Sequence, residues 1–209
     1  MDDLNERQAL IDRILREKGI DAFDDMIKLL EDEDESVREI AAEVIYKLGE
    51  SVVGKLEEIL KEAIKNGERN KISLLYIIDL LGDLNAKRSV RDILKALELY
   101  DLEESQLIIY EALAKLGAGE QFYPLLRYML LEGEERFSLG PQVAIVMSYL
   151  DIPEVVHDLV DAIDSNNFSG EDLEIIKQAL TNIINIRPAY KEILINIVGE
   201  DNFEKYIVK

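Results

Sequence analysis

The chain has 209 residues, of which 48% are hydrophobic, so it can bury a substantial core in one domain or one continuous array. Its 44 acidic and 24 basic side chains give a formal net charge of −20, which disfavours nucleic acid and anionic lipid as partners and favours basic ones. The chain has no cysteine, which excludes disulfides, thiolate metal sites and cysteine nucleophiles.

Helix signals fill the chain and strand signals are nearly absent. No apolar run reaches the length of a membrane span, because charged residues interrupt each of them. The start, MDDLNERQ, is acidic and lacks the basic and apolar regions of a signal peptide. We therefore expect a cytoplasmic protein with no membrane partner.

The first predicted helix, which Asp2 or Asp3 can cap, ends at Gly19 and would cap the N-terminal end of an array. A short amphipathic helix over 23–31 and a longer one over 34–49 then form an antiparallel pair. Asp34 can accept hydrogen bonds from the first free N–H groups of the longer helix, and Gly49 can end it. Its apolar face consists of Val37, Ile40, Ala41, Val44, Ile45 and Leu48.

Paired helices follow to the end of the chain. Their predicted limits are Ser51–Gly67, Lys71–Gly82, Ala86–Tyr100, Leu102–Gly117, Gly119–Leu131, a helix ending at Leu150, Pro153–Ile163, Ser169–Ile184 and Pro188–Val198. Gly140-Pro141 falls early in the helix that ends at Leu150, so we expect a delayed start or a kink there, or else a tolerated early-turn proline. Asn202–Lys209 would form a short terminal helix that covers the open end.

The second helices end at a fixed interval. Their ends are Leu48-Gly49, Leu81-Gly82, Leu116-Gly117, Leu150-Asp151 and Ile184-Asn185, at steps of 33, 35, 34 and 34 residues. A period in this range is typical of stacked helix pairs, none of which can bury its apolar face alone.

The helix over 34–49 resembles the second helix of a HEAT or HEAT-like (armadillo-type) repeat. The resemblance is carried by Asp34, Val37, Arg38, Ala41, Ala42, Leu48 and Gly49. Later copies keep the apolar spacing but have Lys71, Gln106 and Gly140 in the position of Arg38. Tetratricopeptide arrays share the period, but their Trp/Leu-Gly/Tyr signature is absent.

This resemblance implies an all-α fold, namely a right-handed α-solenoid of about five antiparallel helix pairs with terminal capping helices. The expected organisation is a single domain over 1–209. It would consist of a cap at 1–19, repeats at 20–49, 50–82, 83–117, 118–151 and 152–185, and a C-terminal cap at 186–209.

Catalytic and metal-binding signals are weak. His157 is the only histidine and stands beside Asp158, but nothing marks a nucleophile or substrate site for it to serve, so a surface histidine is the favoured interpretation. The acidic run 31–35 lacks calcium-loop spacing and is explained by helix capping. The turn 117–119 follows no strand, so it is not a phosphate-binding loop. We expect no catalytic residue, no cofactor and no metal.

HEAT-like proteins include DNA-repair glycosylases and lyases that act on bilin chromophores. The resemblance to the glycosylases is one of fold only, since they use a basic concave face and this chain is acidic. No matching lyase motif is found.

The polar positions of the middle second helices hold apolar and tyrosine residues instead. In HEAT-like arrays these helices line the concave face. The predicted partner-binding residues are Tyr46, Ile72, Leu75, Tyr76, Leu107, Tyr110, Ile145 and Tyr149. We expect an apolar groove over the second to fourth repeats, rimmed by acidic residues, that holds a protein helix or segment with basic flanks. The alternative is that curvature of the array or the terminal helix buries these residues.

The predicted function is a non-enzymatic protein–protein interaction scaffold or adaptor. Two alternatives stay open: an accessory or regulatory subunit of an enzyme complex, and a homodimer that self-associates through the same face. An enzyme built around His157 is a third and weaker one.

Overall fold

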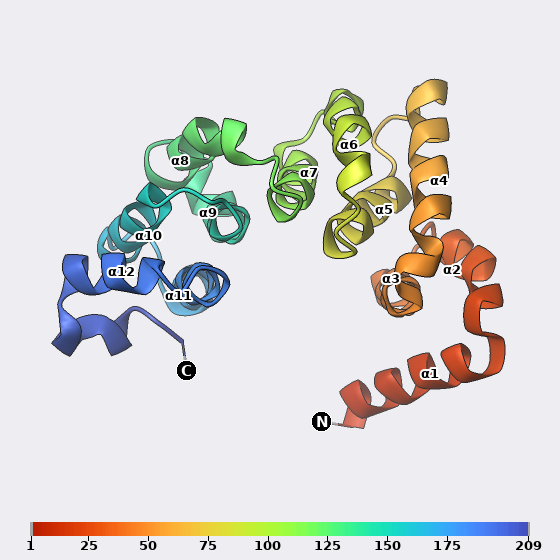
Figure 1. Cartoon of the computed structure of the whole chain (residues 1–209), viewed down its shortest axis with the longest axis horizontal. Helices are drawn as coiled ribbons and strands as arrows, with labels where there is room; N and C mark the ends of the chain where they lie inside the picture. The colour runs from red at the N-terminus through yellow and green to blue at the C-terminus, as the bar shows by residue number, and fades with distance from the viewer. Residues whose placement is uncertain (1, 209) are drawn as a thin grey trace. The chain divides into compact units, whose positions relative to one another are not determined.

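The computed structural model describes the backbone of residues 2–208 and the side chains of 5–208, and all regular secondary structure in that range is helical (Figure 1). This confirms the all-α prediction. The chain forms two compact units, Met1–Ala112 and Leu113–Lys209. The boundary falls inside one helix, α7, and a single continuous array stays a prediction.

The N-terminal unit consists of α-helices of 7 to 17 residues, several of which are flanked by short 3₁₀ turns. The α-helices are α1 (Asp2–Lys18), α2 (Phe23–Leu29), α3 (Glu35–Leu48), α4 (Val53–Asn66), α5 (Ile72–Asp83), α6 (Val90–Ala96) and the first part of α7 (Glu103–Lys115), and the 3₁₀ turns are η1 (Gly19–Ala22), η2 (Gly49–Val52), η3 (Lys87–Ser89) and η4 (Leu97–Leu99). The helix predicted over 86–100 is thus a short α-helix between two 3₁₀ turns. The caps predicted at Asp2 or Asp3 involve side chains outside the described residues.

The C-terminal unit continues in the same manner after α7. Its elements are η5 (Glu120–Phe122), α8 (Tyr123–Leu131), α9 (Arg136–Ser148), α10 (Glu154–Asp164), α11 (Gly170–Ile186), α12 (Tyr190–Val198) and η6 (Glu200–Lys205). Of the segment predicted as a short terminal helix, residues 202–205 belong to this 3₁₀ helix, residues 206–208 are not helical, and Lys209 lies outside the described residues. Val208 lies on α11, where its N–H donates to Thr181 Oγ1 at 2.9 Å.

Helix α3 forms as its capping residues predict. The Asp34 carboxylate accepts a hydrogen bond from the Ser36 N–H at 2.9 Å, and Gly49 ends the helix with a φ of 66°. Arg38 donates from Nη1 to the carbonyl oxygens of Asp32 and Glu33 at 2.7 and 2.9 Å, which ties the preceding loop to the helix.

Several helices pack on a neighbour in the sequence, and several also pack on the next helix but one. In the N-terminal unit α3 contacts α5 and α4 contacts α6, and in the C-terminal unit α8 contacts α10 and α9 contacts α11. Side-chain hydrogen bonds join these neighbours across sequence separations close to the predicted period. Examples are Ser89–Glu57, separated by 32 residues, and Asn182–Ser148, separated by 34.

Gly82 does not end α5, contrary to its predicted role as the glycine stop. The helix continues to Asp83. A Cβ on Gly82 would lie 2.8 Å from the Cα of Ala112, so this glycine lets α5 and α7 approach closely.

Helix α9 contains Pro141 and begins at Arg136, so the delayed start predicted for this helix is wrong. The simpler alternative, a proline tolerated early in the helix, agrees with the structure. Gly140 is needed here for space, since a Cβ would lie 2.6 Å from the buried ring of Phe168.

Candidate partner-binding groove

The N-terminal unit has a cavity of about 310 Å³ on the side where α3, α5 and α7 meet. We call it the α5 groove. It is lined by Glu35 from α3, by Ile72, Leu75, Tyr76 and Asp79 from α5, and by Ile108 and Glu111 from α7.

The spacing of the α5 residues explains why they share the groove. Positions 72, 75, 76 and 79 follow the i, i+3, i+4, i+7 pattern of one helix face. The opposite face of α5 is buried in the core through Leu74, Ile77, Ile78 and Leu81. Both faces of α5 carry apolar residues. One face packs in the core, and the other lines the groove.

The apolar part of the groove is accessible. Ile72 is 47% exposed, and Tyr76 and Ile108 are partly exposed, whereas Leu75 is only 8% exposed and forms the floor. An incoming group can therefore contact aliphatic side chains and one aromatic ring without any rearrangement of the helices.

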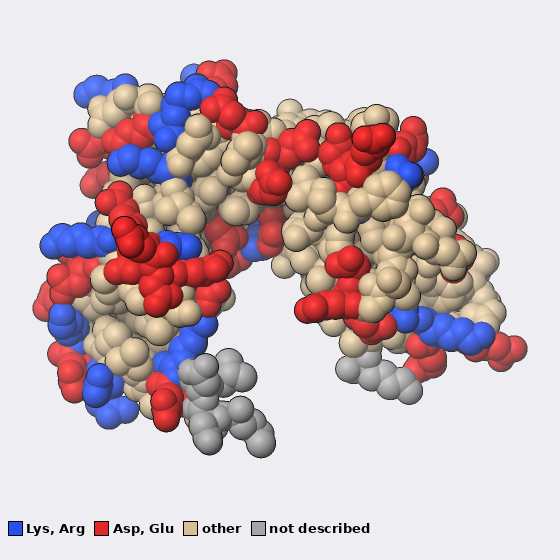
Figure 2. Space-filling view, turned by 180° about the vertical axis from the view of Figure 1, so that it is seen from behind, with Lys and Arg blue, Asp and Glu red and all other residues tan. Residues whose placement is uncertain are grey.

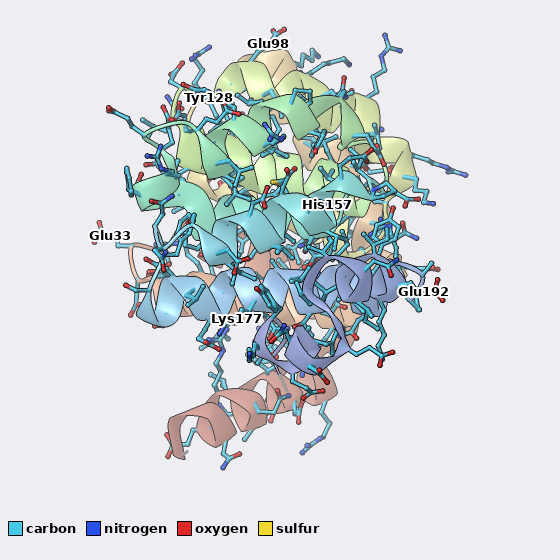
Figure 3. All side chains as sticks on the ribbon, turned by 90° about the vertical axis from the view of Figure 1, so that its left-hand side faces the viewer. Glu33, Glu98, Tyr128, His157, Lys177 and Glu192 are labelled. Carbon is cyan, nitrogen blue, oxygen red and sulfur yellow. The ribbon has the colours of Figure 1, made fainter. Side chains whose placement is uncertain are left out.

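Every charged side chain in the lining is acidic. Glu35, Asp79 and Glu111 come from three different helices, so carboxylates surround the apolar floor. Figure 2 shows acidic side chains gathered over α3 and the loop before it, to which Glu33, labelled in Figure 3, also belongs. Acid was predicted only around the rim, but the structure places it in the lining.

Three of the predicted partner-binding residues, Ile72, Leu75 and Tyr76, meet in the groove. Tyr46 is 48% exposed on α3 but does not line it. Leu107 is 3% exposed and is therefore a core residue rather than a surface one.

Tyr110 is also buried, at 8% exposure, and burial raises the pKa of its hydroxyl. Tyr110 and Leu107 were both predicted to line the groove, and both are buried instead, for one reason. The prediction placed α7 at a step of 35 residues from α5. The groove lining instead matches Ile72 to Ile108 and Leu75 to Glu111, at a step of 36. One residue turns a helix by about 100°, which moves Leu107 and Tyr110 into the core.

Ile108 and Glu35 line the groove, and the sequence pattern missed both. The only signal for Ile108 was that an alignment of α5 and α7 at a step of 36 residues would have paired it with Ile72. Asp79 and Glu111 were not among the predicted partner-binding residues, although acidic residues were expected around the groove.

The remaining two predicted residues lie in the C-terminal unit and take part in internal contacts there. Ile145 is partly buried on α9. The ammonium group of Lys115 lies 5.4 Å from the centre of the Tyr149 ring, and the Tyr149 carbonyl accepts from Arg187 Nη2 at 2.8 Å.

His157 and Asp158 are neighbours on α10 but lie in different surroundings. His157 is exposed on α10, as Figure 3 shows, and this agrees with the prediction of a surface histidine. Asp158 is 4% exposed, and its carboxylate accepts from Tyr123 Oη at 2.7 Å and from Arg127 Nε at 3.2 Å. Burial and this hydrogen bond raise the pKa of Tyr123 to about 12, so the phenol remains a donor at neutral pH.

Within the described part of the chain, no cluster of three or more acidic or histidine side chains has the arrangement needed to hold a metal ion. Among the described helices, none combines the length and apolarity needed to cross a bilayer.

No model of a protein family, no curated protein and no solved structure matches this chain. The residues of the α5 groove are therefore the basis for inferring a function.

Proposed function

We propose that this chain is a non-enzymatic protein-binding module of HEAT-like type, a right-handed α-solenoid whose α5 groove holds a segment of a partner protein. The observation that carries this proposal is the groove itself: one face of α5 presents aliphatic and tyrosine side chains to solvent between two neighbouring helices. The row-like packing of alternate helices in each unit supports the solenoid arrangement.

The size and chemistry of the groove suit a peptide segment. Its volume of about 310 Å³ is at the small end of ligand sites, which run from about 300 to 1,000 Å³. Tyrosine is enriched at interface hot spots because it combines a large contact area with a polar tip, and Tyr76 supplies one here. A helix or extended segment could place one or two side chains in such a site.

Self-association through the same face is the less favoured alternative. Two copies would bring Glu35, Asp79 and Glu111 of one chain against the same residues of another, and like charges at an interface oppose binding. A basic partner segment removes this repulsion, and so does a basic patch on an enzyme that the chain assists.

A peptide-display selection on the full-length chain tests the proposal. The selection should enrich particular peptide sequences from a random library. Ile72→Arg changes a position that is 47% exposed and should weaken binding of the selected peptides at least about tenfold, because the longer side chain fills the groove. Ile20→Arg is the matched control, since Ile20 is 44% exposed in η1 and lies outside the groove. Failure to enrich any peptide, or equal binding by both variants, would contradict the proposal. Light scattering on the same samples reports any homodimer.

A further inference from the structure

Asn66 is the only asparagine of the chain that is followed by glycine. Asparagine is thermolabile because the main-chain nitrogen of the next residue can attack its side-chain amide carbon. This attack is least hindered when the next residue is glycine, which has no side chain and adopts many backbone conformations at low cost. The pair Asn66-Gly67 is therefore the asparagine position where such a reaction is easiest.

The structure leaves this pair exposed at the end of a helix. Asn66 is the last residue of α4, and Gly67 caps the helix in the left-handed conformation with a φ of 66°. The Gly67 N–H donates to the Ile64 carbonyl at 3.2 Å, and the Glu68 N–H donates to the Ala63 carbonyl at 3.0 Å. The last turn of a helix opens and closes while the rest of the protein stays folded. These hydrogen bonds therefore block the attack for only part of the time.

Asn70 lies in the loop that follows and is held more firmly. Its N–H donates to the Leu99 carbonyl at 3.0 Å, and its side-chain amide exchanges two hydrogen bonds with Asp101, at 3.0 and 3.2 Å. The Asn66 amide instead donates to Glu68 Oε1 at 3.3 Å, which is long for a hydrogen bond. Asn70 is therefore an exposed but anchored reference for Asn66.

We propose that Asn66 is a site of spontaneous deamidation. When the last turn of α4 is open, the Gly67 main-chain nitrogen attacks Cγ of Asn66. The new N–Cγ bond closes a five-membered ring, the Cγ–Nδ2 bond breaks, and the proton of the Gly67 N–H leaves with the amide group as ammonia. Water then opens the ring. Opening at Cγ gives aspartate, and opening at the main-chain carbonyl carbon gives isoaspartate, so water is the only reactant consumed.

Either product should weaken the end of α4. A carboxylate at this position lies at the negative end of the helix dipole and no longer donates to Glu68. The pKa of the Glu68 carboxyl is below its ordinary value because Lys71 and Asn66 donate to its carboxylate, so Glu68 is ionised beside the new charge at neutral pH. Isoaspartate also lengthens the main chain and displaces Gly67 from its cap.

Peptide mapping by mass spectrometry tests the proposal on the full-length chain, kept folded and warm at mildly alkaline pH. Asn66 should gain the mass difference between an amide and an acid at least about tenfold faster than Asn70 or the exposed Asn85. An isoaspartate-specific methyltransferase should label the same peptide. Asn66→Gln is the matched control, since it keeps an amide but would have to close a larger ring, and its peptide should stay unchanged.

Tyr110→Ala separates local opening of α4 from global unfolding. This variant removes a buried side chain from the core of the N-terminal unit and should raise the unfolded population more than about tenfold. Asn66 should still convert at the wild-type rate, because the last turn of α4 opens independently of the core. The urea midpoint of Asn66→Asp, which carries one of the two products, should lie below that of Asn66→Gln.

Two outcomes would overturn the inference. Equal conversion of Asn66 and Asn85 in the folded wild type would mean that the helix cap protects the pair. A rate that rises in Tyr110→Ala together with the unfolded population would mean that only the unfolded chain reacts. Equal urea midpoints of Asn66→Asp and Asn66→Gln would contradict the expected weakening of α4.

Discussion

At the scale of single residues, the tyrosines of the second helices have different environments in spite of their similar sequence positions. Tyr46 is 48% exposed, Tyr76 lines the α5 groove, and Tyr110 is 8% exposed in the core. A tyrosine on an amphipathic helix is equally suited to a core edge or to an interface, because it has an apolar ring and a polar tip. Only the rotation of each helix decides which of the two it becomes.

Alanine at these tyrosines should separate the two roles. Tyr110→Ala should lower the free energy of unfolding by about 3 kcal/mol, since it leaves a cavity in the core of the N-terminal unit. Tyr46→Ala, at an exposed position, should change it by no more than about 0.5 kcal/mol. Urea unfolding followed by circular dichroism measures both. Equal stability of the two variants would place Tyr110 at the surface and contradict its burial.

Two tyrosines of the C-terminal unit couple stability to alkaline pH. Burial, together with a hydrogen bond to Asp158 or to Asp151, raises the pKa of Tyr123 and of Tyr190 to about 12 each. The Tyr190 hydroxyl donates to Asp151 Oδ1 at 2.8 Å. An unfolded tyrosine has a pKa of about 10. Since the folded values are higher, the stabilisation is fully present below pH of about 10 and is lost as the pH rises towards about 12.

The urea midpoint should therefore fall between pH of about 10 and 12 in wild type. Tyr123→Phe and Tyr190→Phe should each reduce this fall, and the double variant should reduce it most, because phenylalanine does not ionise. Both single variants should also be less stable at pH of about 8, because each loses a hydrogen bond to a carboxylate. A double variant with the same alkaline fall as wild type would show that these hydroxyls do not carry the effect.

At the scale of elements, two glycines in similar sequence contexts have different structural roles. Gly49 and Gly82 both follow leucine at the predicted end of a second helix. Gly49 ends its helix with a φ of 66°, whereas Gly82 is inside α5 and is needed because Ala112 of α7 lies against it. The sequence pattern predicts the same helix-ending role for both glycines. The packing of the neighbouring helix α7 gives Gly82 a different role.

Gly82→Ala should lower the free energy of unfolding by about 1 to 3 kcal/mol, because the added methyl overlaps Ala112 and pushes α5 away from α7. Ala112→Gly in the same chain should not restore the loss, because the overlap at 2.8 Å is with the backbone Cα of residue 112, which glycine keeps. Gly54→Ala in α4 is the control, since a Cβ there meets nothing within 4 Å, and it should be neutral or stabilise by up to about 1 kcal/mol. Denaturant titration of the four chains checks these values. A neutral Gly82→Ala would mean that the two helices do not approach so closely.

At the scale of the whole molecule, charge is the dominant property. The net charge of −20 is spread over both units and opposes the compact state through self-repulsion. Ion pairs such as Arg7–Glu39 and Arg69–Asp101 lie at exposed or half-exposed positions, where each contributes little. Repulsion should therefore outweigh attraction at neutral pH.

Added salt should accordingly stabilise the chain. The melting temperature at pH of about 7 should rise between about 20 mM and 500 mM NaCl, because screening weakens repulsion among the excess carboxylates. Near the sequence isoelectric point of about 4.4 the rise should disappear, since the net charge is then close to zero. Calorimetry at the two pH values measures the difference. A melting temperature that falls with salt at neutral pH would show that the ion pairs dominate.

The sequence by itself determined the helical class, the approximate limits of the helices, the cap at Asp34 and the presence of apolar and tyrosine residues on the second helices. These features depend on local spacing and capping, which neighbouring residues settle among themselves. The tertiary structure alone decided which of those residues meet. A change of one residue in the step between α5 and α7 places Ile108 in the groove and Tyr110 in the core, and the packing of Gly82 against Ala112 is part of that arrangement. The physical reason is that both faces of these helices are apolar, so the sequence pattern does not fix the rotation of each helix about its axis, and close packing against its neighbours does.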